Sequence, residues 1–465
     1  MDTPIFKQLW QDKYQVVPEN LKKLKKLNAV ATGFNTNIDA ICRLTGEKLK
    51  MLIEQEGLSL AELQNIERKQ IVDETDFLKG VFKTFTLGIA EEWICESKDV
   101  YGWIEKNVGY EYLQMGGQGG IIANVLSSVG IKKVIAHTNS LPKLQAETFA
   151  KNDNLISFDE NGKPKPAYLI NRRNDVPLIH FIIEFRRGDT MELEGKLFKC
   201  PRSNRFIATY DPLNLKLVLN EHFMKALQHE PLDFVILSGF HALQAKNDGL
   251  NLIDQAAARI KEWKDMMPQT LFHLEIASTQ DLAIRQAIVQ KLVPLVDSIG
   301  INERETMDVL EVINQKALAK YCNEQTTAEN LLKGISKIKE ITNVKRIQLH
   351  MFGLYMTLKD KDFALSLDDN LKGMLTASVV AAAKAKTSNT DEQSIQSVTY
   401  DVSDVGLIEL ESLSIALGQP SLALTGIGRY RTWDLIVTPT ILIENPVTLV
   451  GMGDTISALS LVSAK

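Results

Sequence analysis

A glycine-rich turn near the C-terminus carries the residues best suited to chemistry in this chain. Gly451, Met452, Gly453 and Asp454 follow an apolar and β-branched run at 447–450, which predicts a buried strand. The two glycines permit a tight turn with exposed N–H groups, and we expect Asp454 to open a helix. Such a turn offers a cradle for phosphate charge with a carboxylate beside it, as phosphoryl transfer to a hydroxyl requires. The plain alternative is an N-cap aspartate after a glycine-rich loop.

Polar residues also follow an apolar run near the N-terminus. Residues 28–33 predict a short strand, and Asn35, Asn37 and Asp39 come after it. The C-terminal edge of an open α/β sheet is where ligands bind, so these side chains are candidates for holding a substrate. Considered alone, the segment is explained equally well by an Asx turn before the next helix.

A second glycine-rich loop lies at 115–120. It contains Gly116, Gly117 and Gln118, and we expect it to open a helix over 121–129. Glycines let the backbone approach a ligand closely, and the amide of Gln118 can contact a hydroxyl. Taken alone, such a loop is weak evidence.

Oxygen-bearing side chains mark two further strand ends in the C-terminal half. Glu275 lies near the end of an expected strand, while Asn302 ends the next one and Glu305 lies in the helix turn that follows. In a doubly wound sheet such ends lie along one edge and can converge. Their oxygens suit Mg²⁺, which keeps waters and needs few carboxylates. Taken singly, a strand-edge salt bridge for Glu275 and a favourable helix-dipole charge for Glu305 are the simpler explanations.

Basic residues crowd one segment of this acidic chain. Eight arginines and lysines occupy the 34 positions from 172 to 205, although the net charge of the chain is −5. They are Arg172, Arg173, Arg186, Arg187, Lys196, Lys199, Arg202 and Arg205. We expect them to form a local anion-binding surface.

The elements that position these residues are predicted from the hydrophobic pattern. Residues 46–79 look helical and 80–98 continue in the same style, whereas from 206 onward strands and helices alternate. The strands expected there are 234–237, 270–276, 296–301, 345–349 and 353–358, with helices over 251–264, 282–292 and 328–339. Repeated β–α units predict a parallel sheet covered on both faces, that is, an α/β protein.

Composition excludes several classes of protein. The 465 residues are 45% hydrophobic and 24% charged, which is ordinary for a soluble globular protein. The net charge argues against nucleic acid or an anionic membrane as a partner, and no run is long enough for a membrane span. The four cysteines are widely spaced, which argues against a zinc site or a disulfide framework and favours a cytoplasmic location. The sequence leaves the oligomeric state open and is compatible with a monomer.

Taken together, the motifs resemble one family over essentially the whole chain. The segments that carry the resemblance are Gly33-Phe34-Asn35-x-Asn37-x-Asp39, Gly116-Gly117-Gln118, Asn204-Arg205-Phe206, His273-x-Glu275, Asn302-x-x-Glu305, His350-x-x-Gly353 and Gly451-x-Gly453-Asp454. The sequence resembles the ADP-dependent sugar kinases, the archaeal glucokinases and 6-phosphofructokinases of the ribokinase superfamily. Neither a P-loop nor a His-Arg-Asp loop of other phosphotransferases is present.

The resemblance implies a role for each motif. Asp454 would take the proton of the acceptor hydroxyl, and the N–H groups of Gly451, Met452 and Gly453 would form the anion hole. Asn302 and Glu305 would organise Mg²⁺ through water, with Glu275 in the same metal network. The sugar would be held by Asn35, Asn37, Asp39, Gly116, Gly117 and Gln118.

The nucleotide, ADP, would be held by a different set of residues. Arg205 would touch its phosphates from a lid. Asn302, the segment from His350 to Gly353 and a loop over 426–440 that includes Val437 would lie at the nucleotide. The fold implied is a ribokinase-like doubly wound sheet domain with a smaller α+β lid domain. We expect the large domain to comprise 1–40, 108–165 and 205–465, and the lid to comprise 41–107 and 166–204.

The sugar is the open question. In this family a lid glutamate favours glucose, and either Glu91 or Glu92 could take that role. Fructose 6-phosphate needs cations for its phosphate, and Arg173, Lys199 and Arg202 could supply them. Both features together imply a bifunctional enzyme or a phosphofructokinase with glucokinase activity. An ATP-dependent kinase of the same superfamily and a non-catalytic ligand-binding protein remain as alternatives.

Overall fold

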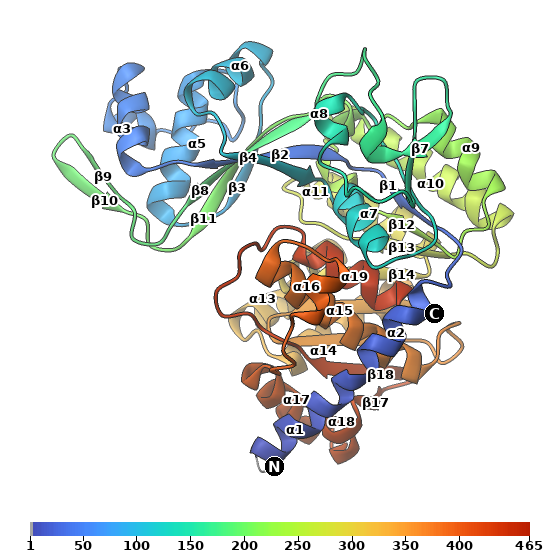
Figure 1. Cartoon of the computed structure of the whole chain (residues 1–465). Coiled ribbons are helices and arrows are strands. Elements are labelled where there is room, and N and C mark those ends of the chain that lie inside the picture. The colour runs from blue at the N-terminus through green and yellow to red at the C-terminus, as the bar shows by residue number, and fades with distance from the viewer. Residues whose placement is uncertain (1–2) are drawn as a thin grey trace.

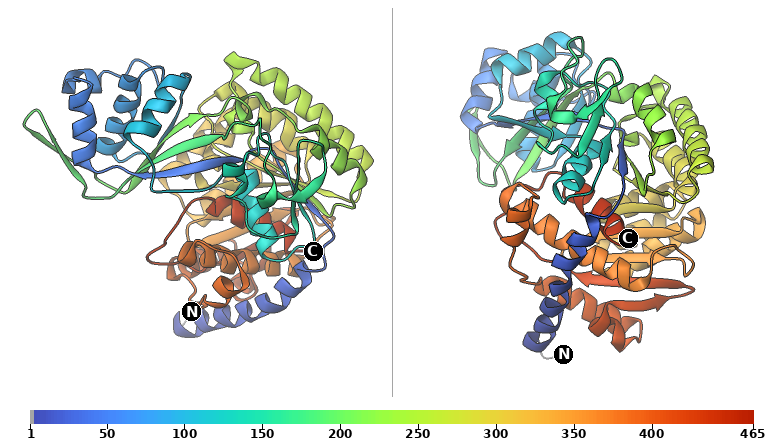
Figure 2. Two further views of the ribbon diagram at one scale, coloured as in Figure 1. Left: turned by 45° about the horizontal axis from the view of Figure 1, so that its top comes forward. Right: turned by 45° about the vertical axis from the view of Figure 1, so that its right-hand side comes forward.

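The structure is a computed structural model that describes residues 3–465 and contains two main β-sheets of unequal size. An 11-stranded sheet forms the body of the molecule, and a five-stranded sheet forms a smaller part projecting from one side of it (Figure 1). The smaller part also stands out from the body in both turned views (Figure 2). We call these parts, each with its helices, the large and the small domain.

The large sheet is parallel in its centre and antiparallel at its edges. In spatial order its strands are β17 (Ile427–Tyr430), β18 (Trp433–Pro439), β16 (Leu354–Lys359), β15 (Arg346–Met351), β14 (Ser298–Asn302), β13 (Leu271–Glu275), β12 (Phe234–Leu237), β1 (Val30–Gly33), β5 (Val134–Ala136), β6 (Leu155–Phe158) and β7 (Pro164–Pro166). The strands from β15 to β6 run parallel. Every residue of β12, β15 and β16 is buried, as expected for strands covered on both faces. The predicted α/β sheet is therefore confirmed.

Helices follow the strands as the alternating pattern predicts. Those of the large domain are α1 (Thr3–Lys13), α2 (Val17–Leu24), α7 (Gln118–Ser128), α8 (Lys143–Ala146), α9 (Glu221–His229), α10 (Gly249–Met266), α11 (Leu282–Ala287), α12 (Glu303–Val312), α13 (Lys316–Glu324), α14 (Ala328–Thr342), α15 (Leu367–Thr387), α16 (Glu392–Gln396), α17 (Asp404–Ala416), α18 (Pro420–Thr425) and α19 (Met452–Val462). Helix α19 packs against α7 and α15 and against β13 to β15, which places its start at the centre of the sheet. No helix within 3–465 combines the length and apolar character needed to cross a membrane.

The small domain has its own sheet and its own apolar core. Its strands, in spatial order, are β3 (Glu91–Ile94), β11 (Asn204–Tyr210), β8 (Ile179–Phe185), β2 (Asn37–Arg43) and β4 (Tyr112–Gly116). Its helices are α3 (Gly46–Gln55), α4 (Leu60–Gln64), α5 (Glu74–Leu87) and α6 (Lys98–Asn107), and β9 (Thr190–Leu193) pairs with β10 (Lys196–Lys199) as a separate hairpin. Alternate residues of the strands enter the core beneath these helices. The opposite face of the sheet is therefore left for polar side chains.

The sheets place some segments on the other side of the expected domain boundaries. β2 begins in a segment assigned to the large domain, and β4 lies wholly within one. β11 begins at the last residue assigned to the lid and continues into a segment assigned to the large domain, yet all three strands belong to the small sheet. The chain passes between the two sheets four times, at 34–36, at Gly117, at 171–178 and at 211–214.

Three local expectations were wrong. Residues 80–98 contain strand β3 as well as the end of α5. The run at 447–450 is a loop, in which Val447 and Leu449 are 67% and 65% exposed. The last strand before α19 is β18, which ends at Pro439, so the chain reaches the helix through a loop. Helix α19 begins at Met452, so Asp454 is its third residue rather than its first.

Candidate active site

The turn before α19 has the geometry expected of an anion cradle. Gly451 is the N-cap residue and has a φ of +65°, a conformation that favours glycine. A Cβ on Gly451 would lie 2.6 Å from Cγ2 of Ile121, so the position has no space for a side chain. The first N–H groups of an α-helix have no intrahelical acceptor, and the helix dipole adds positive potential there. The start of α19 can therefore hold an anion.

Asp454 lies beside this turn and contacts the second glycine-rich loop. Its Oδ1 accepts a hydrogen bond of 3.0 Å from Nε2 of Gln118, whose Oε1 in turn accepts one of 3.2 Å from the N–H of Gly239. Burial raises the pKa of Asp454, while the Gln118 bond and the charges of Lys384 and His241 oppose the rise. The contact joins two motifs that are 336 positions apart in sequence.

The residues expected to hold the sugar also converge. Nδ2 of Asn37 donates to Oδ1 of Asp39 at 2.9 Å. A Cβ on Gly116 would lie 2.1 Å from that Oδ1, and one on Gly117 would lie 2.7 Å from the carbonyl oxygen of Asn35. The glycines are thus required by close packing against the asparagines. Oδ1 of Asn35 and Oδ1 of Asn37 are buried without a hydrogen-bond partner in the described structure, so both are acceptors for hydroxyl donors.

The two glutamates expected to select the sugar, Glu91 and Glu92, point to opposite faces of β3. Glu91 shares the face of the buried Trp93, whose Nε1 donates to it at 2.8 Å. Lys83 of α5 pairs with the same carboxylate at 2.6 Å, so Glu91 is held against the helices. Glu92 lies on the opposite face, where Oγ1 of Thr209 donates to it at 2.6 Å. Adjacent strand residues alternate in direction, so only one of the two can face the site.

Glu92 belongs to the polar face of the small sheet. Its charge acts on Asp39 and on His180, and also on His241 of the large domain. His180 lies on β8 in register with Asp39 of β2, and its Nε2 lies 3.1 Å from Oδ2 of Asp211. Glu92, rather than Glu91, is therefore the glutamate near the expected sugar-binding residues.

The expected metal residues lie near Asp454 but are partly engaged with each other. Asn302 and Glu305 form a capping box: Oδ1 of Asn302 accepts from the N–H of Glu305 at 2.9 Å, and Oε2 of Glu305 accepts from the N–H of Asn302 at 2.8 Å. Burial raises the pKa of Glu305 to about 8, with the nearby charge of Asp454 adding to the effect. The pair therefore caps the start of α12, so the simpler interpretation, a role at the helix start, accounts for part of what these residues do.

The buried carboxylate of Glu275 is the feature of the site that best fits a bound cation. It is 5% exposed, and its Oε2 is buried without a well-formed hydrogen bond in the described structure, with Nε2 of His273 3.5 Å away and Ser457 nearby. Burial raises its pKa well above the usual range, and the charges of Glu305 and Asp454 raise it further. Three buried carboxylates that destabilise one another fit a hard divalent cation such as Mg²⁺. No group of three His, Cys, Asp or Glu side chains placed to hold a metal ion occurs among residues 3–465, and the expectation that Mg²⁺ is held through water stays a prediction.

His273 on β13 contacts both β14 and α19 close to Glu275. Nδ1 of His273 lies 3.0 Å from Oγ of Ser298, and its Nε2 lies 2.8 Å from Oγ of Ser457 on α19. Burial lowers the pKa of His273 well below its ordinary value, so the ring is neutral at neutral pH. Its Nε2 lies 3.5 Å from Glu275, which makes it a support for that carboxylate.

The residues expected at the nucleotide are dispersed. His350 lies at the turn, because a Cβ on Gly453 would be 2.8 Å from its Nε2. Gly353 lies in the β15–β16 turn with a φ of +81° and packs against Gly406. The expected loop at 426–440 is instead the β17–β18 hairpin, and Val437 has no exposed surface because β18 lies between β16 and β17. Val437 therefore offers no contact to a ligand.

Comparison with known proteins decides the family. A conserved region described as ADP-specific phosphofructokinase/glucokinase matches residues 28–463. The chain belongs to this family.

Similar proteins extend over almost all of the chain. An ADP-specific phosphofructokinase of Pyrococcus abyssi is 31% identical, over 92% of this chain and 96% of the relative. An ADP-dependent glucose/glucosamine kinase of the same organism is 30% identical, over 98% of each chain. A solved structure of an ADP-dependent kinase in complex with fructose-6-phosphate and ADPβS has a TM-score of 0.82 and 29% identity, and the match covers 98% of this chain and 97% of that one.

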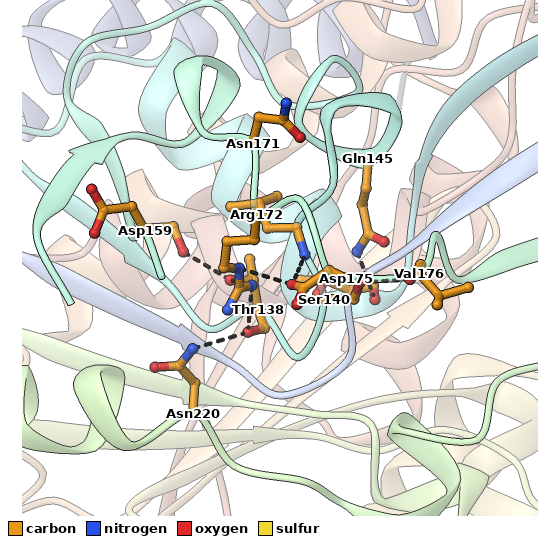
Figure 3. A network of polar contacts seen from close by, with 12 residues as sticks. Thr138, Ser140, Gln145, Asp159, Asn171, Arg172, Asp175, Val176 and Asn220 are labelled. Atoms are coloured by element: carbon orange, nitrogen blue, oxygen red, sulfur yellow. Dashed lines mark hydrogen bonds and ion pairs between the residues drawn. The ribbon is translucent and has the colours of Figure 1, made fainter. Parts of the chain in front are cut away.

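The basic residues between 172 and 205 were expected to form an anion-binding surface, but they do not form one surface. Arg172 is buried in a network at the end of β5, where its guanidinium donates to O and Oγ1 of Thr138 at 3.1 and 2.8 Å (Figure 3). It also pairs with Asp175 at 2.9 Å, and Asp175 accepts from the N–H of Leu141 at 2.7 Å. Arg172 therefore anchors the segment before β8 and is not available to a ligand.

Arg173, Lys199 and Arg202 are separated by the length of β8. Arg173 precedes this seven-residue strand, whereas Lys199 lies on β10, beyond its far end. Nε of Arg202 is already bonded to the carbonyl of Gly88. At roughly 3.3 Å per residue the strand spans about 20 Å, more than one sugar phosphate can bridge. Arg205, at the start of β11, lies close enough for its charge to act on Asp39.

Three residues at the site were not anticipated from sequence. They are His180, His241 and Lys384. Burial lowers the pKa of His241, although the charges of Glu92 and Asp454 oppose this, and its Nδ1 is buried without a partner in the described structure. A histidine two positions after the Gly239 turn at the end of β12 was a usable signal for the site. Nothing in the spacing of His180 or Lys384 marks them.

Proposed function

We propose that the protein transfers a phosphoryl group from ADP to a hydroxyl of a sugar and releases AMP. The observation that carries the proposal is the position of Asp454. It lies within the first turn of α19 and is bonded at 3.0 Å to Gln118, which directly follows the glycines packed against Asn35, Asn37 and Asp39. A carboxylate between an anion cradle and a set of unpaired hydrogen-bond acceptors suits the activation of a hydroxyl.

The residues of the chain divide the work of the reaction. Asp454 accepts the proton of the attacking hydroxyl, while Gln118 keeps its carboxylate oriented. The N–H groups of Gly451, Met452 and Gly453 stabilise the charge on the transferring group. Mg²⁺, when bound near Glu275, Asn302 and Glu305, would neutralise phosphate charge.

The small domain acts as a lid in this proposal. Its polar sheet face carries Glu92, Asp39 and His180, and Arg205 lies on the same face. Closure over the sugar brings this face to the turn of α19 and excludes water, which limits hydrolysis of ADP. Arg205 then contacts the phosphates of the nucleotide.

Two sugars fit the proposal to different degrees. Glu92 on the site face supports glucose, because its carboxylate can accept a hydrogen bond from a neutral hydroxyl. Relatives named for phosphofructokinase support fructose 6-phosphate. Because Arg173 lies far from Lys199 and Arg202 in the structure, these residues support fructose 6-phosphate as the substrate less than their proximity in the sequence suggested. We propose activity on both sugars.

The decisive experiment measures AMP formation. Purified protein is incubated with Mg²⁺, with ADP or ATP as donor, and with glucose or fructose 6-phosphate as acceptor. AMP formed from ADP in the presence of either sugar supports the proposal. ADP formed from ATP, with no AMP from ADP, would instead assign an ATP-dependent kinase.

The base role is tested by Asp454→Asn. The substitution keeps the shape and removes the proton acceptor, and general base catalysis contributes about 10²–10⁴-fold. We expect kcat to fall by that factor while calorimetry shows ADP binding largely retained. Activity within a few-fold of wild type would exclude Asp454 as the base.

A further inference from the structure

Lys384 contacts the anion-binding turn at the start of α19. It lies near the C-terminal end of α15, the helix that packs along α19. Its Nζ donates to the carbonyl oxygen of Gly451 and to Oγ1 of Thr455, each at 3.2 Å. A Cβ on Gly451 would lie 2.9 Å from the same Nζ. The ammonium group is therefore in direct contact with the backbone of the turn.

The end of α15 holds this loop at a second point. The N–H of Val447 donates to the carbonyl of Ala385 at 2.7 Å. The Gly451 carbonyl also accepts from the N–H and Oγ1 of Thr455, at 3.1 and 2.7 Å. Because the carbonyl and the next N–H belong to one peptide plane, fixing the Gly451 carbonyl also fixes the direction of the Met452 N–H.

The charge of Lys384 is costly where it lies. The dipoles of two helices act on it in opposite senses, because the start of α19 disfavours a cation while the last turn of α15, where Lys384 lies, favours one. Among the titratable groups around it, Asp454 of α19 is the one whose charge favours the ammonium, while α7 contributes the apolar Ile121 to the turn. Burial lowers the pKa of Lys384 to about 8 in spite of Asp454. An anion bound at the start of α19 would compensate the cost.

We propose that Lys384 is a positioning residue for phosphoryl transfer, which fixes the Gly451 carbonyl and places a positive charge behind the anion-binding turn. The inference rests on the proposed function and adds to it. Lys384 acts through the backbone of Gly451, so it orients the Met452 N–H before the phosphoryl group binds. It also couples anion binding to protonation, because a bound anion stabilises the ammonium form.

The first test compares three variants for kcat and KM. Lys384→Met removes the charge and both hydrogen bonds, whereas Lys384→Arg keeps a charge. Lys386→Met is the matched control, because Lys386 lies on the same helix turn but is exposed and bonded to the carbonyl of Ser397 at 2.6 Å. Since misplacement of reacting groups can cost roughly 10²-fold, we expect Lys384→Met to lose up to about that factor in kcat, with the sugar KM nearly unchanged. Lys386→Met should behave as wild type.

The pH dependence distinguishes positioning from a purely structural role. If the ammonium form is needed, wild-type kcat/KM falls as the pH rises above about 8, where Lys384 of the free enzyme loses its proton. A guanidinium stays charged throughout this range, so the Lys384→Arg variant should keep its activity to higher pH. A wild-type alkaline limb unchanged in this variant, or a folded Lys384→Met protein with wild-type kcat, would overturn the inference.

A binding measurement separates this inference from the proposed function. Titration of ADP at pH 8 in buffers of different ionisation enthalpy should show proton uptake by the wild type and less by Lys384→Arg. Equal uptake by both would overturn the role of Lys384, whether or not the protein forms AMP. Absence of AMP with normal, Lys384-dependent uptake would instead contradict the proposed function alone.

Discussion

At the scale of single residues, strand alternation separates Glu91 from Glu92. Glu91 is bound by Lys83, Lys69 and Trp93 on the helix side of β3, and Glu92 lies on the face with Asp39 and His180. A carboxylate on that face can bind a neutral sugar and repels a dianionic one. The two glutamates therefore form a matched pair for testing which sugar the lid selects.

We expect Glu92→Ala to reduce kcat/KM for glucose by about 10–150-fold, since a charge-assisted hydrogen bond contributes roughly 1.5–3 kcal/mol. The same change should spare or improve kcat/KM for fructose 6-phosphate. Glu91→Ala should leave the ratio of the two activities unchanged and affect only stability. Parallel loss of both activities in Glu92→Ala would mean that this glutamate shapes the lid instead of selecting the sugar.

The choice between these glutamates was available in the sequence. Trp93 is large and apolar and must be buried, so on a strand Glu91 would share its face and Glu92 would face the other way. The segment was expected to continue the helical pattern of 46–79, and that assignment concealed the alternation. Contacts such as Asp454 with Gln118 could be inferred only from the family resemblance, since local pattern does not encode pairs so far apart.

At the scale of elements, Asn302 and Glu305 cap the start of α12 at the place where a metal role is proposed for them. The β14–α12 junction was predicted correctly, because Asn302 ends the strand and Glu303 begins the helix. The apolar run at 447–450 was not, because a short apolar segment has the same pattern whether it pairs in a sheet or crosses the surface. Capping residues are thus more informative in this chain than short apolar runs.

The capping box predicts different outcomes for two substitutions at Glu305. Glu305→Gln keeps an acceptor for the Asn302 N–H, and it mimics the protonated form that a pKa of about 8 implies for the free protein at neutral pH. Glu305→Ala removes the acceptor and should lower the free energy of unfolding by about 1 kcal/mol. Both should raise the Mg²⁺ concentration needed for half-maximal activity. Denaturant unfolding and magnesium titrations check this, and unchanged magnesium curves would contradict a metal role.

At the scale of the whole molecule, three of the four crossings between the sheets are connected through hydrogen bonds around one buried carbonyl. The oxygen of Thr36, between β1 and β2, accepts from Nε2 of Gln145 at 3.3 Å and from Nδ2 of Asn214 at 3.2 Å. Gln145 also accepts from the N–H of Leu178 at 3.3 Å, just before β8. Three of the four crossings are therefore joined around Thr36. No local sequence pattern predicts this group of contacts, because Gln145 lies on α8 and Asn214 lies on a different crossing, both far from Thr36 in sequence.

A surface contact joins the same two domains in a different way. Nζ of Lys246 in the large domain lies 3.5 Å from Glu96 of the small domain, and both side chains are exposed. Exposed ion pairs contribute about 0–1 kcal/mol, because water screens them. The contacts around Thr36 are buried, so they should matter more for how the domains are held than the exposed pair does.

We therefore expect Gln145→Leu and Lys246→Ala to differ. Gln145→Leu keeps the approximate volume but leaves the Leu178 N–H without its partner, which costs about 1–3 kcal/mol in unfolding free energy. It should also alter the compaction that small-angle scattering detects when ADP and sugar bind, because the crossings lose their common support. Lys246→Ala should leave stability and compaction close to wild type. If Gln145→Leu only lowered stability and left compaction and kcat unchanged, the contacts around Thr36 would contribute to packing alone and not to the movement of one domain relative to the other.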